Sequence, residues 1–248
     1  MRNRCFDPST RRRYKMSTEA EFKALKDLAI IDGLLMCLMT HANTIRRAEI
    51  LVVMPGVFER NRVSQALKCA ERVQAKRFIC TGTNPEEREK GELYNKELIN
   101  KLWAAVGGVA HPPFFRIEAD EVGNHARMQS MNAAKRLVAE PPTGIVLQTG
   151  GSWHTPRSYL TFIQACIELF DEARLPLPRI YPLLVDTGIG SQIKAASELH
   201  KQSGYASGID GLVKTAEAEV DRRLTYTDKG HLADLEKMRQ YMAHLLES

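Results

Sequence analysis

The sequence IVLQTGGSWHTPRSYLTF, residues 145–162, decides the fold class. Its apolar run Ile145–Leu147 predicts a β-strand, Gly150 and Gly151 predict a tight loop, and the pattern from Thr155 onward predicts a helix. A strand that continues through a short loop into a helix is part of a βαβ unit. Such units build parallel sheets that are covered by helices on both faces.

Three further strands are predicted ahead of this stretch. Apolar runs at Glu49–Met54 and Arg77–Thr81 have the length and continuity of parallel strands buried on both faces, and a helical pattern over Asn61–Gln74 joins them. Phe114–Ile117 predicts a weaker strand, preceded by one long helix over Pro85–Ala105. These segments extend the alternation of strand and helix toward the N-terminus.

One more strand is predicted after the central stretch. Arg179–Val185 is mostly apolar, and Pro182 favours a position at the sheet edge, because proline lacks the N–H that a central strand needs. The alternation predicts an α/β fold. We expect a Rossmann-like three-layer α/β/α arrangement with a mainly parallel sheet of about five strands and with helical N- and C-terminal additions.

The predicted domain organisation follows from the same pattern. Residues 1–16 are expected to form a flexible basic N-terminus, and residues 17–248 a single α/β domain whose core spans about 47–188. A helix is predicted from Ser17 onward, ahead of the sheet. The C-terminal helical extension, about 189–248, contains predicted helices over Ser191–Gln202, Gly208–Leu224 and Lys229–Leu246.

Composition limits the classes of function. The chain has 248 residues and a formal net charge of +5, and part of the basic excess lies in the N-terminus. The remainder is close to neutral, which disfavours a nucleic-acid-binding surface.

The five cysteines form no Cys-x-x-Cys pair, so we expect a reducing compartment. The apolar segment Leu28–Met39 is too short for a membrane span and too far along for a secretory signal, so we expect a cytoplasmic protein. The oligomeric state is left open.

The loops after the predicted strands carry small, hydroxyl and basic residues. In a parallel α/β sheet, ligands bind beside the carboxyl ends of the strands, near the point where the strand order reverses. Glycines let backbone N–H groups approach an anion closely, and the first turn of a helix favours negative charge. We therefore predict that a small anionic molecule binds at Gly56, Arg60, Arg62, Thr81, Gly82, Asn124, Thr149, Gly150, Gly151, Ser152 and Arg157.

Two residues are candidates for catalysis at this edge. His154 lies one helical turn before Arg157, on the same helix face, and can donate or accept a proton near neutral pH. Glu118 is predicted to end the third strand and so to reach the same edge. No histidines pair at metal-ligand spacing, and no metal site is predicted. The same sequence also fits a plain helix start, with His154 and Arg157 facing water.

Several motifs together resemble the bacterial YdcF, SanA and ElyC family. They are ILVVMPGVFERNRVSQAL, RFICTGT, Glu118 followed by Asn124, and SWHTPRSYLTF, and they cover about Arg47–Phe170. The later stretch EVDRRLTYTDKGHLADL resembles the Glu-x-x-Arg-x-x-x-Tyr-x-x-Lys-Gly extension of soluble YdcF-like members. Where the family has Asn-Thr-x-Glu-Asn, this chain has NHARM at residues 124–128, so the carboxylate of that motif is absent.

The resemblance implies a Rossmann-like domain that binds a nucleotide-like or otherwise phosphorylated molecule. It also suggests S-adenosylmethionine as a cofactor and cell-envelope metabolism as a related process, but it implies no established reaction. The sequence leaves two functions open. One is an enzyme that acts on the bound molecule with His154 as acid or base. The other is a non-catalytic ligand-binding or regulatory module that uses the same pocket. Nucleic-acid binding through the basic N-terminus is a third and weaker hypothesis.

Overall fold

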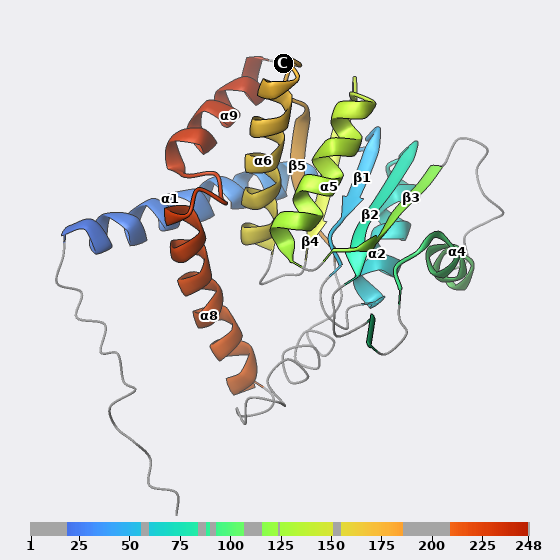
Figure 1. Ribbon diagram of the computed structural model, residues 1–248, viewed down its shortest axis with the longest axis horizontal. Helices are drawn as coiled ribbons and strands as arrows, with labels where there is room; N and C mark the ends of the chain where they lie inside the picture. Colours follow the sequence, from blue (N-terminus) through green and yellow to red (C-terminus); the bar gives the residue numbers. More distant parts are fainter. Residues whose placement is uncertain are drawn as a thin grey trace, which may run out of the picture.

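The computed structural model describes residues 19–55, 60–83, 88–89, 93–106, 116–123, 125–150, 155–185 and 209–247. Its centre is a sheet of five parallel strands in the order β3-β2-β1-β4-β5 (Figure 1). The strands are β1 (Ile50–Val53), β2 (Arg77–Thr83), β3 (Arg116–Val122), β4 (Ile145–Gly150) and β5 (Arg179–Leu184). This strand order is that of Rossmann-like folds and confirms the predicted fold class.

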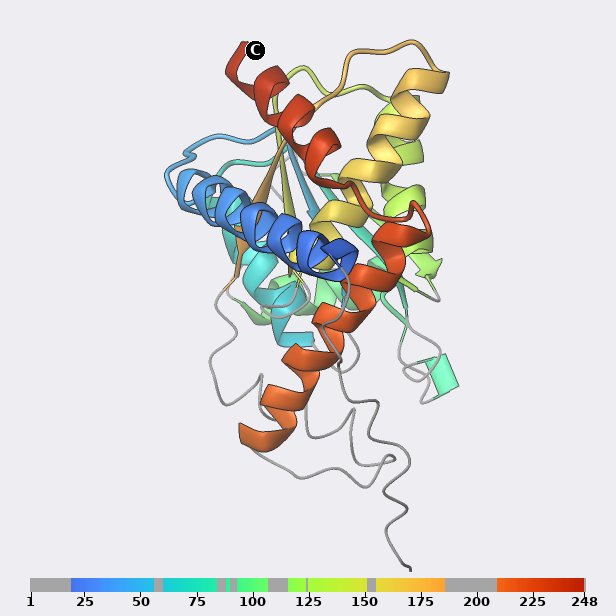
Figure 2. The ribbon, with the colours of Figure 1, turned by 90° about the vertical axis from the view of Figure 1, so that its left-hand side faces the viewer.

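Helices cover both faces of the sheet. They are α1 (Glu19–Ala42), α2 (Arg60–Arg72), α4 (Lys96–Ala105), α5 (Ala126–Ala139), α6 (Thr155–Glu172), α8 (Ile209–Asp228) and α9 (Leu235–Glu247). Figure 2 views the sheet from its β5 edge, with α1 and α2 on one side and α5 and α6 on the other. Helix α2 contacts β1 and β2, whereas α6 contacts β4 and β5. The three layers are therefore those expected from the sequence.

The core lies around the central strand. All four residues of β1 are fully buried, and so is every residue of the apolar run Phe78–Cys80 in β2. Strands covered on both faces read as continuous apolar runs rather than as alternating ones, and this explains why these two strands were predictable. All strand pairs are parallel, and in their register Val52 is opposite Ile79 of β2 on one side and Gln148 of β4 on the other.

The C-terminal helix protects the β5 edge of the sheet. Tyr241 of α9 is buried, and its hydroxyl accepts a hydrogen bond from Ile180 N at 2.6 Å and donates one to Pro178 O at 2.9 Å. The Tyr159 hydroxyl of α6 donates to Ile180 O at 2.8 Å. Burial raises the pKa of both tyrosines well above the ordinary value, so both hydroxyls keep their protons. The edge position predicted from Pro182 is confirmed.

Several predicted boundaries were wrong. Strand β2 continues through Gly82 and Thr83, and β3 continues to Val122. The helix predicted over Pro85–Ala105 is not continuous, because residues 93–95 are not helical. Helix α4 starts after Asn95, whose side chain accepts a hydrogen bond from Leu98 N at 2.9 Å. Asparagine competes for local backbone N–H groups in this way and so begins helices.

The C-terminal prediction is also corrected. Helix α8 continues to Asp228. The helix predicted from Lys229 starts only at Leu235. Asp234 precedes it, and its side chain accepts a hydrogen bond from Lys237 N at 2.9 Å. Gly230, at φ +68°, lies in the turn between the two helices. The helix predicted over Ser191–Gln202 and the N-terminal residues 1–16 lie outside the described residues.

Replacement of Tyr241 by Phe is expected to destabilise the fold. It would leave the buried Ile180 N–H without the hydroxyl acceptor seen here, at a cost of about 1–3 kcal/mol. Tyr159→Phe is the matched control, because it removes one donor to Ile180 O but leaves the Ile180 N–H bonded to Tyr241, and its expected cost is about 1 kcal/mol. Urea unfolding of both variants measures the difference, and equal costs would contradict the assignment.

Candidate functional site

The strand order reverses between β1 and β4, and the candidate site is at the carboxyl ends of these two strands. The crossover helices α2 and α6 cover opposite faces there, as at the ligand-binding edge of other open α/β sheets. Thr149 and Gly150 end β4, and Thr149 O accepts a hydrogen bond from Met54 N at 3.1 Å. The structure thus brings the end of β4 and the chain after β1 together, as the sequence predicted.

The predicted binding residues on α2 and β2 hold the backbone at this edge. Arg62 is buried, and its Nη1 donates to Met54 O at 3.0 Å. The buried Thr81 hydroxyl donates to Val53 O at 3.4 Å. Gly82 has φ +72°, a conformation that side chains rarely adopt. These contacts give Arg62, Thr81 and Gly82 structural roles beside any contact with a ligand.

Gln129 is a residue that the sequence reasoning missed. It lies in α5 and is buried, and its side-chain nitrogen is 3.3 Å from Gly82 O and 3.5 Å from both Pro55 O and Gly123 O. One amide therefore joins the end of β2 to the chain segments that follow β1 and β3. No local motif marks such a residue, because its partners come from distant parts of the sequence.

The start of α6 is packed closely against the end of β4. A Cβ atom at Gly150 would lie 2.3 Å from the Ser158 hydroxyl, so a side chain has no room there. Gln148 donates to the Ser158 hydroxyl at 3.3 Å, and that hydroxyl donates to Thr155 O at 3.2 Å. Gly150 is therefore required for the packing of α6, whatever else its backbone binds.

Arg157 extends away from the sheet toward α8. Its Nε and Nη2 donate to the two carboxylate oxygens of Glu219 at 2.6 and 3.2 Å, and the side chain of Glu219 is only 4% exposed. Arg222 pairs with the same carboxylate at 2.5 Å. The Arg157 guanidinium also lies 5.9 Å from the centre of the Tyr226 ring. A bidentate pair of this kind fixes the orientation of the guanidinium.

A pocket of about 200 Å³ lies beside this ion pair, where α5 and α6 start and α8 ends. Four of its lining residues are basic or can become so, two from α5 and its cap, one from α6 and one from the turn after α8. The lining residues are His125, Ala126, Arg127, Arg157, Thr161, Tyr226 and His231. None of the lining residues described is acidic.

The α5 side of the pocket is the start of a helix. His125 is the N-cap, and its Nδ1 accepts a hydrogen bond from Met128 N at 3.2 Å, which leaves the ring proton on Nε2. Arg127 pairs through Nη2 with Glu168 of α6, while its buried Nη1 has no hydrogen-bond partner among the described residues. The pocket therefore contains donors and the positive end of a helix dipole.

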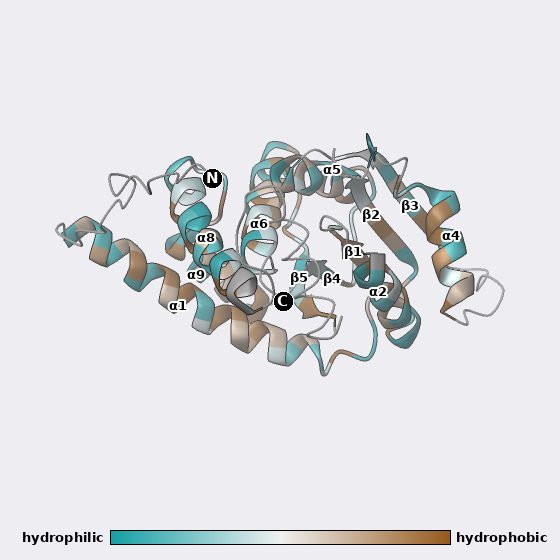
Figure 3. Cartoon of the chain, turned by 90° about the horizontal axis from the view of Figure 1, so that it is seen from below, coloured by the Kyte–Doolittle hydropathy of each residue, from teal (hydrophilic) through white to brown (hydrophobic). Residues whose placement is uncertain are grey.

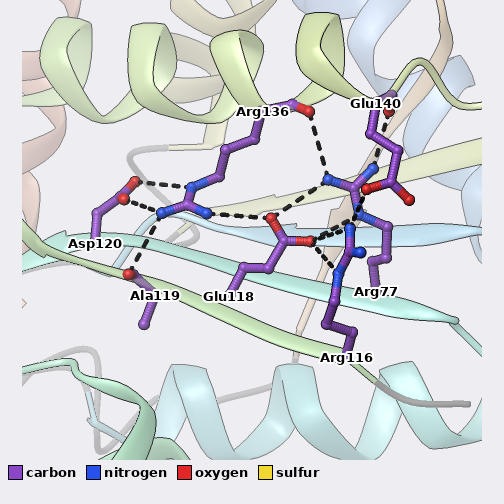
Figure 4. A network of polar contacts seen from close by, with 7 residues as sticks. All are labelled: Arg77, Arg116, Glu118, Ala119, Asp120, Arg136 and Glu140. Atoms are coloured by element: carbon purple, nitrogen blue, oxygen red, sulfur yellow. Dashed lines mark hydrogen bonds and ion pairs between the residues drawn. The ribbon is translucent and has the colours of Figure 1, made fainter.

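Glu118 is not at the carboxyl edge, contrary to prediction. It lies inside β3, opposite Ile79, in a network of charged residues that reaches the end of α5 (Figure 4). Arg77 contacts its two oxygens at 2.7 and 3.3 Å, and Arg136 at 3.2 Å. Arg116 donates to it at 3.0 Å, and Arg116 and Arg136 also pair with Glu140 and Asp120 respectively. This network links two strands to a helix.

The remaining predicted site residues cannot be placed in this geometry. Outside the described residues lie Gly56, Asn124, Gly151, Ser152 and His154, together with the side chain of Arg60.

Within the part of the chain that is described, no three His, Cys, Asp or Glu side chains gather as metal ligands would. No described helix is both long enough and apolar enough to cross a membrane. In comparisons with known proteins, neither a family model nor a curated protein matches the chain.

Gly123 lies very close to Gly82 at the carboxyl edge, and this contact can be tested by adding a side chain. A Cβ atom there would lie 2.7 Å from Gly82 Cα, so Gly123→Ala is expected to destabilise the fold by about 1–3 kcal/mol. The control is Gly33→Ala, measured on dilute protein so that only contacts within one chain count; a Cβ atom there meets nothing within 4 Å in a helix interior, and a gain of about 0.5–1 kcal/mol is expected. Denaturant unfolding gives both values, and a neutral Gly123→Ala would refute the close contact.

The Glu118 network predicts a pH dependence of stability. Burial opposes ionisation, but the hydrogen bonds and charges of Arg77 and Arg116 outweigh it and hold the pKa of Glu118 below its ordinary value. The carboxylate then stabilises the fold fully above the unfolded-state pKa, about 4.3, and this contribution is lost as the pH falls through the folded-state pKa.

Glu118→Gln is therefore expected to cost about 1–3 kcal/mol at pH 7, with the gap to the unmodified chain closing below about pH 4. Glu97→Gln is the control, because Glu97 is an exposed partner of Lys101 on α4, and exposed pairs contribute little. Urea unfolding across pH tests both variants. A gap that is constant with pH would show that Glu118 does not act through its charge.

Proposed function

We propose that this chain binds an anionic small molecule, nucleotide-like or phosphorylated, in the pocket between α5, α6 and α8. The observation that carries the proposal is the composition of the pocket lining: two arginines and two histidines, with no acidic residue among those described. Arginine matches the geometry of phosphate and carboxylate groups, and histidine adds a neutral or charged donor.

The helix geometry supports the same ligand class. His125, Ala126 and Arg127 are the cap and the first residues of α5, and all three line the pocket. The first N–H groups of a helix have no partner within the helix and carry partial positive charge, so they favour an anion. The Met128 N–H uses Nδ1 of His125 and leaves Nε2–H as a donor, and the buried Nη1 of Arg127 has no hydrogen-bond partner among the described residues.

The α8 side of the pocket favours a ring-containing ligand. Tyr226 and His231 place their ring centres 6.0 Å apart with 35° between the ring planes, and both line the pocket. Such rings provide a surface on which a base or a sugar can pack. At about 200 Å³, the pocket is smaller than the 300–1,000 Å³ typical of sites for drug-sized molecules, so it holds the acidic end of a ligand rather than a whole dinucleotide.

The resemblance to the YdcF, SanA and ElyC family supports the proposal from another direction. Two of the stretches that carry it are far apart in sequence, yet Arg157 of the first contacts Glu219 and Tyr226 of the second. Both motifs therefore contribute to one pocket. We propose that the chain is a YdcF-like protein with S-adenosylmethionine among its candidate ligands, and that catalysis would require His154 as acid or base.

Arg127→Ala is the sharpest test of the pocket. Its partner Glu168 would keep a hydrogen bond from Gln164 at 2.7 Å, so the change does not leave a carboxylate unpaired. Loss of one charge-assisted hydrogen bond, about 1.5–3 kcal/mol, predicts roughly tenfold or greater weakening of ligand binding. Lys135→Ala is the matched control, because it removes the same charge from an exposed position on the same helix.

The measurement is a thermal-shift screen with inorganic phosphate, nucleotides, sugar phosphates and S-adenosylmethionine, followed by titration calorimetry. A ligand at 100 times its dissociation constant adds about 2.7 kcal/mol of stability. Binding that is weakened by Arg127→Ala but not by Lys135→Ala supports the pocket. No stabilisation by any of these anions, or equal weakening in both variants, refutes it. Product formation from a bound ligand separates an enzyme from a binding module.

A further inference from the structure

Helix α1 is apolar on both of its sides. One side packs on the sheet and contributes the buried residues Leu28, Ile31, Leu35, Leu38 and Ala42. The opposite side, here called the outer face, consists of Phe22, Lys26, Ala29, Ile30, Gly33, Met36, Cys37 and Thr40, all of them exposed. A surface helix of a globular protein normally carries charged and polar residues on that side. Beyond the first turn of the helix, only Lys26 of this outer face is charged.

Large apolar side chains of the outer face are in contact with solvent. Phe22 is 60% exposed, Met36 66% and Ile30 36%. Figure 2 shows α1 running across the front of the molecule with no described element over this face, and Figure 3 shows apolar bands along the helix. Contiguous apolar surface of this kind marks an interaction site more often than single exposed residues do.

The outer face is nearly self-complementary about Gly33. If a second α1 lies antiparallel across it with a two-fold axis at Gly33, residues at equal sequence distances before and after Gly33 face each other. Ile30 then faces Met36 of the second copy, and Ala29 faces Cys37. Lys26 faces Thr40, so no like charges meet inside the contact. A two-fold interface requires this kind of self-matching patch.

Charges at the two ends of the helix agree with the same arrangement. Glu19 and Glu21 lie in the first turn, and the exposed Arg46 and Arg47 follow the last turn. An antiparallel arrangement brings the first turn of one helix, with its glutamates, toward the arginines that follow the last turn of the other. A parallel arrangement would instead place glutamates beside glutamates and arginines beside arginines.

We propose that the outer face of α1 is the contact between two copies of this chain, arranged as an antiparallel helix pair that crosses at Gly33. A Cβ atom at Gly33 meets nothing within 4 Å in the single chain, so this position is open to a partner. Packed helices have axes about 8–10 Å apart, and the Cα atoms that face each other across the crossing are then close enough for a disulfide.

The register of this contact is tested with a cysteine at the crossing. Gly33→Cys is made in a chain with Cys5→Ser, Cys37→Ser and Cys69→Ser, and mild oxidation is expected to give a disulfide-linked dimer in high yield. Thr40→Cys in the same background is the control, because it lies on the same face but its symmetry-related copy is two helical turns further along in each direction. Thr40→Cys is expected to remain largely uncrosslinked.

The unmodified full chain provides the second measurement. Sedimentation equilibrium is expected to show a dimer that dissociates on dilution, and Met36→Glu is expected to give a folded monomer by circular dichroism, whereas Met36→Leu stays dimeric. A chain that is monomeric at high concentration overturns the proposal, including the case in which its own N-terminal residues cover the face. Equal crosslinking of Gly33→Cys and Thr40→Cys also overturns it, since it would indicate random collision.

Discussion

The complete burial of β1 is the constraint on which the rest of the structure depends. Every residue of this strand is inaccessible to solvent, so its backbone N–H and C=O groups must be paired inside the sheet, with β2 on one side and β4 on the other. Parallel neighbours on both sides require crossovers in opposite directions, which place α2 and α6 on opposite faces. The carboxyl edge between β1 and β4 is the direct result.

Ion pairs of two buried charges on α8 then determine where this helix packs. Glu219 and Arg223 of α8 are both buried, and they pair with Arg157 of α6 and with Asp32 of α1, the latter at 2.8 Å. A buried charge without its partner costs several kcal/mol, so these pairs strongly disfavour other positions of α8. Because α8 supplies Tyr226 to the pocket, the same pairs that position the helix also complete the pocket wall.

The sequence was sufficient for the fold and insufficient for the site. Buried strands and amphipathic helices are local patterns, and Pro182 correctly indicated the edge strand. Glu118 was misplaced because a strand can continue through polar residues when arginines from a neighbouring strand and helix pair with them. The partner of Arg157 was not predicted, because Glu219 lies 62 residues away and only the packing of α8 brings it near. Gln129 was missed for the same reason.

The pairing of both pocket arginines bears on how an anion would be recognised. Glu219 and Glu168 neutralise much of the charge of Arg157 and Arg127, so long-range attraction is weak and geometry matters more. A guanidinium has five N–H donors, and a carboxylate on one side orients the others without using all of them. The orientation is then established during folding rather than during binding, which reduces the entropy cost of binding. Recognition by oriented donors selects a ligand by the shape of its acidic group as well as by its charge, and this favours phosphate or carboxylate over a simple halide ion.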